Sequence, residues 1–277
     1  MTTLIIAQLT IQETQRRRIL WIGGIMAVLF LLIFGIGTHY IFLEWEESNI
    51  VGETFDIVSG LLLSAGLYVV NFLIIIMSVL TSVTAVSSEI DTHTIETLIT
   101  KPVNRWEVVL GKYVGFAGLL LLYVLLLAGG LILIFTLRSG LVVHNIAYGL
   151  AIMVLQGLVV LSVTIFGGTR LSTLANGVFA FMLYGLAFIG GWVEQIGSLL
   201  RNETAVDIGI ATSLIMPTEI LWKKALSLFQ PQIATSTSFA GPFAVSSQPS
   251  DLMIQYAVAY TVIILILALF SFSRKDL

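Results

Sequence analysis

The chain has no cysteine and few charges, and both shortages exclude classes of protein. Without cysteine there is no disulfide framework, no thiol nucleophile and no thiolate metal site. Only 10% of the residues are charged, whereas soluble domains carry about a quarter. The net charge of −3 argues against a nucleic-acid partner. The three histidines lie far apart in sequence, so no metal site is expected, and the first residues lack the basic region of a cleavable signal peptide.

What the chain has instead is long apolar runs. Hydrophobic residues make up 57% of it and the mean hydropathy is +1.01, both typical of membrane proteins. A helix needs about 20 apolar residues to cross a hydrocarbon core of about 30 Å. Stretches 19–38, 57–86, 108–137, 146–166, 174–192 and 252–272 satisfy this. The sequence therefore predicts an all-α integral membrane protein with six transmembrane helices, forming a single transmembrane domain over 1–277.

The basic residues predict the orientation. With the N-terminus inside, 9 of the 13 lysines and arginines fall on the inner side and 4 on the outer side. Inner loops carry the excess of basic residues in membrane proteins. We therefore expect a multi-pass protein of the cell inner (plasma) membrane with both termini in the cytoplasm.

Two further segments are not predicted to span. Residues 1–18 form a modestly amphipathic pattern that ends in arginines, which favours a helix in the inner interface; a frayed tail is the alternative. The segment 193–251 is expected outside the membrane. Within it, 218–229 places Leu221 and Ala225 on one face and Lys223 and Lys224 on the other, which predicts an interfacial helix on the outer leaflet.

The segment 87–107, between the second and third spans, is rich in charged residues and in residues that begin or end helices. Ser88 can cap a short helix, Pro102 ends it, and Asn104 begins the next one. Two interpretations stay open from the residues alone: a solvated loop that separates two spans, or a docking helix for a cytoplasmic partner. The exposed face of this helix would carry Glu89, Asp91, Thr92, His93, Glu96 and Lys101.

This segment resembles the ABC type-2 exporter permeases. That family carries a spaced pattern of Glu, Gly-Thr, Leu-Leu, Pro-Val-x-Arg and Gly-Lys between its second and third spans. The six-span plan matches too, so the resemblance covers nearly the whole chain, and it is strongest to the branch of multicopper-enzyme-maturation and sodium-export permeases. His93 stands where the family usually has Gly. The matching residues here are Glu89, Thr94, Leu98, Pro102, Val103, Arg105, Gly111 and Lys112.

The resemblance implies a coupling helix that is gripped by a separate ABC ATPase subunit. Two ATPases would pair with two permease copies, or with this chain and a related permease, in contact with membrane lipids. ATP and Mg²⁺ would be bound by the ATPase; this chain would hold no cofactor and no metal and would perform no catalysis. The family also implies a dimer seam near the first and fifth spans and a path bordered by the second and fifth. The implied ATPase-docking residues are Glu89, Asp91, His93, Thr94, Glu96, Lys101 and Arg105.

Polar residues inside the predicted spans are few. The spans hold no acidic or basic residue except Lys112, which argues against a secondary transporter, and the chain has no phosphate-binding loop. Asn71, Gln156 and Asn176 are interpreted first as hydrogen-bonding links between helices. The alternative is that Asn71 or Asn176 lines the path. The Gly111-x-x-x-Gly115 motif predicts close helix packing within one subunit.

The function predicted from these features is that of the permease subunit of an ATP-driven ABC exporter. The alternative is a non-transporting membrane anchor or sensor that recruits a cytoplasmic partner through 87–107. A secondary carrier is the third hypothesis for the function. The apolar path suits lipids, hydrophobic drugs or peptides, but polymer and ion exporters share the same plan.

Overall fold

The chain folds into a bundle of helices. The computed structural model describes all residues except 1, 17, 49–51, 86–103, 230–248 and 275–277, and the described residues contain no strand. The elements are α1 (Thr2–Arg16), α2 (Arg18–Glu47), α3 (Glu53–Ser82), α6 (Arg105–Val124), the π-helical turn η1 (Leu125–Gly129), α7 (Gly130–Ser139), α8 (Ile146–Gly168), α9 (Thr173–Leu199), α10 (Glu203–Ile215), α11 (Thr218–Phe229) and α13 (Asp251–Ser273).

The prediction of six membrane-spanning helices is confirmed. In the described part of the chain α2, α3, α8, α9, α13 and the continuous run Arg105–Ser139 are long and apolar enough to cross a membrane. Most helices extend past the predicted apolar windows because backbone hydrogen bonding continues into the polar ends, whereas α3 begins before its predicted window 57–86 and ends within it, at Ser82. The run Arg105–Ser139 has 35 residues, about 50 Å at about 1.5 Å per residue, so it projects beyond the hydrocarbon core or tilts.

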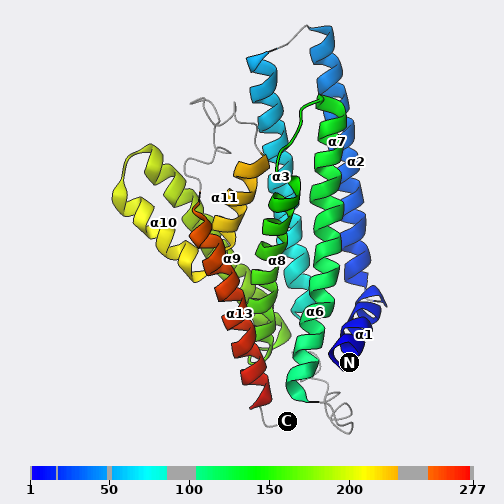
Figure 1. Cartoon of the computed structure of the whole chain (residues 1–277), viewed down its shortest axis with the longest axis vertical. Helices are drawn as coiled ribbons and strands as arrows, with labels where there is room; N and C mark the ends of the chain where they lie inside the picture. The colour runs from blue at the N-terminus through cyan, green and yellow to red at the C-terminus, as the bar shows by residue number, and fades with distance from the viewer. Residues whose placement is uncertain (1, 17, 49–51, 86–103, 230–248, 275–277) are drawn as a thin grey trace.

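Both termini lie at the same end of the bundle, as six spans require (Figure 1). We call this the terminal end and the opposite one the far end. Helix α8 is central, packing against α3, α6, α9, α11 and α13. In its apolar window 67% of the residues are buried within the chain, compared with 11% in α2 and 17% in α13. Helix α8 is therefore a core helix, whereas α2 and α13 present most of their surface outward.

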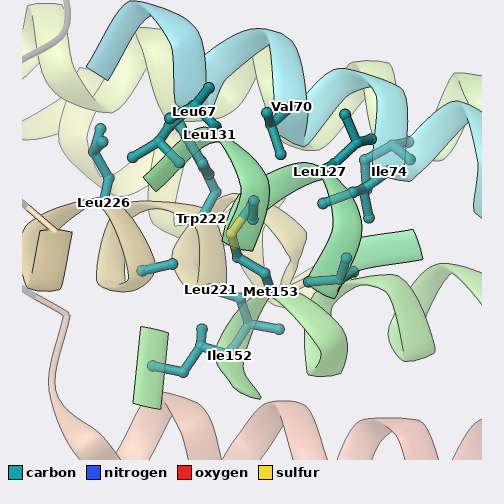
Figure 2. Close-up of a cluster of buried hydrophobic side chains, with 14 of the residues drawn as sticks. Leu67, Val70, Ile74, Leu127, Leu131, Ile152, Met153, Leu221, Trp222 and Leu226 are labelled. Carbon is teal, nitrogen blue, oxygen red and sulfur yellow. The ribbon is translucent and has the colours of Figure 1, made fainter. Parts of the chain in front are cut away.

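The main core joins four parts of the chain. Figure 2 shows Leu67 and Val70 of α3 and Met153 of α8 around Trp222 of α11. Leu131 of α7 completes this contact, and all five side chains are buried. Because lipid tails are as apolar as leucine, such packing stabilises the bundle through van der Waals contact rather than through removal of water. Helix α11 is thus an integral part of the bundle.

Helix α1 packs directly on the start of the third span. A Cβ atom placed on Gly111 would lie 2.7 Å from Cβ of Ile6, and one placed on Gly115 would lie 2.8 Å from the carbonyl oxygen of Ala7. The two glycines therefore allow α1 to lie in backbone contact with α6, which confirms that this motif serves packing within one chain. The interfacial role of residues 1–18 stays a prediction.

Helices α10 and α11 form a V-shaped pair beside α9 (Figure 1). Their axes meet at 104° across the break at Met216 and Pro217, as in a broken span or a re-entrant loop. The predicted helix 218–229 has the observed bounds, but its predicted exposure is wrong. Lys223, expected on an open polar face, is only 7% exposed. The reason is that α9 covers that face and supplies an ionic partner, which helical periodicity alone cannot reveal.

Candidate functional site

Most of the predicted docking residues lie in the segment 86–103, outside the described residues: these are Glu89, Asp91, His93, Thr94, Glu96 and Lys101. The structure places the seventh, Arg105, at the first turn of α6. Asn104 precedes it with an extended backbone, φ −68° and ψ 137°, and accepts a hydrogen bond from the Glu107 amide at 3.0 Å. The predicted helix start after Pro102 is therefore confirmed, and Arg105 stands where that segment enters the bundle.

The two ends of this segment are joined by a buried lysine. Lys112 Nζ, in α6, donates a hydrogen bond of 2.5 Å to the carbonyl oxygen of Ala85, which follows α3. Lys112 is only 7% exposed. An ammonium group at such depth is stable only when it is hydrogen-bonded. The exit of α3 and the entry of α6 are thus held together, and a displacement of the intervening segment acts on both helices.

Asn176 extends this connection to two more helices. Its side-chain nitrogen, on α9, donates to the carbonyl oxygens of Thr164 in α8 at 2.9 Å and of Val83 at the end of α3 at 3.4 Å. Asn176 is fully buried, and its oxygen lies where a Cβ on Gly167 would be. In the structure Asn176 therefore links helices, and its suggested role in lining a path stays a prediction.

A groove of about 560 Å³ lies between α3 and α9. It is almost wholly apolar and opens on the outside of the bundle; Thr173 is the one polar residue among those that line it. A Cβ on Gly177 would touch Val83 at 3.4 Å, so this glycine sets the narrow approach of the two helices beside the groove. The groove can hold an apolar chain or ring system. Its other walls include Leu80, Leu174, Phe181 and Met182.

Farther along the same pair of helices, toward the far end, lies a buried ionic cluster that α11 completes. Lys223 Nζ pairs with Glu194 Oε2 of α9 at 2.9 Å and donates to the carbonyl oxygen of Gly191 at 3.3 Å. Glu219, one helical turn before Lys223, is 3% exposed and lies against Gly191, where a Cβ would be 2.2 Å from its Cγ. A buried carboxylate and a buried ammonium group therefore lie together with a second, partly buried carboxylate, that of Glu194.

This cluster corrects the prediction that the spanning helices carry no acidic or basic residue except Lys112. The apolar window 174–192 ends before Glu194, but α9 continues as one helix to Leu199 and carries Glu194 into the bundle. Helix α11 brings Glu219 and Lys223 to it. The available sequence signal was the spacing of four residues between Glu219 and Lys223, which places both on one helix face; nothing local identified α9 as their partner.

Aromatic and amide side chains adjoin the cluster. Tyr68 of α3 packs edge-on against Trp222 of α11, with ring centroids 4.8 Å apart. Tyr184 of α9 faces Asn71 of α3, and the charge of Glu219 acts on the hydroxyl groups of both tyrosines. Asn71 is 3% exposed, and its side-chain oxygen has no hydrogen-bond partner. Asn71, suggested from the sequence as a path-lining residue, therefore lies beside Tyr184, which adjoins this cluster.

No three histidine, aspartate or glutamate side chains in the described ranges are grouped so that they could hold a metal ion. Buried Gln156 of α8 has neither side-chain amide atom hydrogen-bonded among the described residues, so its predicted hydrogen bond to another helix is not observed there.

Comparison with known proteins gives one result for the whole chain. The model of a family described as "ABC-2 family transporter protein" matches residues 4–277. No curated protein matches the sequence.

Proposed function

The chain belongs to the ABC-2 transporter family, and from this premise we propose that it is the permease subunit of an ATP-driven exporter. Two separate ATPase subunits would bind ATP and Mg²⁺. They would act on two copies of this chain, or on this chain and a related permease. The chain itself is a membrane transport component and performs no covalent chemistry. The observation that carries the proposal is the match over 4–277, which includes the whole coupling segment.

The contacts at the terminal end support a way for movement of the segment 87–107 to be transmitted to the membrane helices. The ATPase would dock on 87–107 and move this segment when it closes on ATP. Because Lys112 ties the Ala85 end to α6, the two long helices on either side of the segment would move as a pair. Asn176 would pass part of this displacement to α8 and α9. The seam between α3 and α9 would then open and close with ATP turnover.

The groove between α3 and α9 supports a path along that seam. It agrees with the second and fifth spans as the borders of the path, and its apolar lining suits a substrate with an apolar body. Asn71 and Asn176 would face the path when the seam opens. The outward surfaces of α2 and α9 would form the seam between two permeases, since only 11% and 33% of their apolar windows are buried within one chain.

The proposed orientation places both termini in the cytoplasm of a cell whose inner (plasma) membrane holds the protein. The 9-to-4 distribution of basic residues supports it. The ATPases would then meet the terminal end of the bundle, and the α10–α11 pair would lie toward the outer leaflet.

The test is a triple variant, Glu89→Ala with Asp91→Ala and Glu96→Ala, co-expressed with the proposed partner ABC ATPase. Loss of a carboxylate from a buried contact costs about 2–5 kcal/mol, whereas a rim charge costs far less. We expect normal membrane insertion, loss of ATPase co-purification and loss of substrate-stimulated ATP turnover in liposomes. Glu47→Ala, at the end of α2, is the control for charge loss.

Equal behaviour of the triple variant and Glu47→Ala would contradict docking through this segment. A complex that forms and hydrolyses ATP without any flux across the liposome membrane would favour the anchor or sensor instead. Flux driven by an ion gradient in the absence of an ATPase would indicate a secondary carrier.

A further inference from the structure

We propose that Glu219 is the anionic centre of a binding site for the ammonium group of an amphipathic amine. The site lies along the α3–α9 seam, where α11 packs against both helices near the middle of α3. This inference rests on the proposed function, because it names the class of substrate that the seam would carry.

The first argument is charge balance. Glu194 is paired with Lys223 at 2.9 Å, and this pair neutralises itself. Glu219 is buried to 3% exposure beside them, and none of the hydrogen bonds and ion pairs found among the described residues is made by its carboxylate. The neighbouring Lys224 points away and pairs with Asp251 at 3.0 Å. When Glu219 is ionised, its negative charge has no partner in the pair beside it, and an uncompensated buried charge requires a cation or a proton.

The second argument is the set of groups around this carboxylate. Asn71 Oδ1 is a buried acceptor without a partner. The rings of Tyr68 and Trp222 meet edge-on at 4.8 Å, and Tyr184 lies on the other helix of the seam. A carboxylate with a second acceptor accepts hydrogen bonds from an ammonium group, and aromatic faces attract the positive charge and its C–H groups.

These neighbours favour an organic cation over a metal ion. Ca²⁺ takes six to eight oxygen ligands, and Mg²⁺ requires an octahedral set. The described residues around Glu219 offer one free amide oxygen and are otherwise aromatic or already paired. An ammonium group needs few acceptors and gains from aromatic neighbours.

The third argument is continuity with the groove. The apolar groove of about 560 Å³ and the Glu219 cluster lie along the same two helices, the groove where α3 ends and α9 begins, and the cluster nearer the middle of α3, at Tyr68. A molecule with an apolar tail and a cationic head matches both. Gly191 gives the Glu219 side chain its place against α9, so a side chain at that position would displace the carboxylate.

The experiment compares three probes that share an eight-carbon tail: octylamine, protonated at pH 7, octanol and octanoate. Binding to the full chain in nanodiscs of zwitterionic phospholipid is measured by titration calorimetry, with empty nanodiscs subtracted. We expect saturable binding of octylammonium, about tenfold weaker in Glu219→Gln and severalfold weaker in Tyr68→Leu. Glu203→Gln, on exposed α10, is the control with equal charge loss and should bind as the wild type does.

Equal affinity in the wild type, Glu219→Gln and Tyr68→Leu would overturn the proposal, as would equally strong, Glu219-dependent binding of octanol. If octylammonium fails to bind the wild type above the nanodisc background, Glu219 holds a proton only, which also overturns it. If Glu219→Gln fails to fold, the test relies on Tyr68→Leu, provided that this variant unfolds at the same temperature as the wild type. ATPase co-purification, measured on the same variants, tests the proposed function separately.

Discussion

The buried ion pair between α11 and α9 leads to a quantitative prediction for Lys223→Met. Methionine keeps most of the side-chain volume but removes the charge. The pair is short, at 2.9 Å, and its side chains are 9% and 17% exposed. Removing one partner of a buried pair costs about 3–5 kcal/mol, because the other charge is left uncompensated. Here two carboxylates, Glu194 and Glu219, would face each other without a cation, so we expect the upper part of that range.

The adjacent lysine provides a matched control. Lys224 pairs with Asp251 at 3.0 Å, but the aspartate side chain is 77% exposed, so solvent screens this pair. Lys224→Met should therefore cost less than about 1 kcal/mol. A double variant, Lys223→Met with Glu194→Gln, removes one of the two carboxylates left without a cation and should recover about 2–3 kcal/mol of the loss.

The assay is reversible unfolding of the full chain in mixed micelles, followed by circular dichroism during titration with a denaturing detergent. It reports the free energy of unfolding of each variant. Equal losses in Lys223→Met and Lys224→Met, or additive effects of Lys223→Met and Glu194→Gln, would refute the conclusion that a buried ion pair joins α11 to α9.

Three further predictions concern packing and topology. Gly115→Ala should destabilise the protein by about 1–3 kcal/mol, because the added Cβ would lie 2.8 Å from the backbone of α1. Gly118→Ala is the control and should not destabilise the protein, because Gly118 has open space around it. Thermal unfolding compares the two variants. Asn176→Leu should cost about 1–2 kcal/mol, because two buried carbonyl oxygens lose their donor; unchanged stability would show that these bonds contribute nothing. A cysteine at Ser48 of this cysteine-free chain should react with an impermeant thiol reagent on intact cells and one at Thr92 should not, and the reverse pattern would invert the topology.

The sequence alone determined the positions of the six spanning helices, but not that of α10. Uninterrupted apolar runs of about 20 residues can satisfy their backbone groups in lipid only as helices, so composition and length sufficed for all six spans. Local signals also fixed the start of α6 after Pro102 and the bounds of α11. The family was predictable as well, because its motif is a spaced pattern within one short stretch of the chain, from Glu89 to Lys112. The match over 4–277 confirms that family.

Only the tertiary structure decided which polar groups meet. The amphipathic pattern of α11 was consistent with a helix on the membrane surface, and burial followed only because α9 supplies Glu194 to Lys223 at 2.9 Å. Likewise, the sequence places Lys112 near a helix end but cannot show that it donates to Ala85, 27 residues earlier. Helical periodicity reports which face of a helix is polar. Whether that face meets water, lipid or another charged helix depends on contacts between distant parts of the chain, and those contacts exist only in the folded bundle.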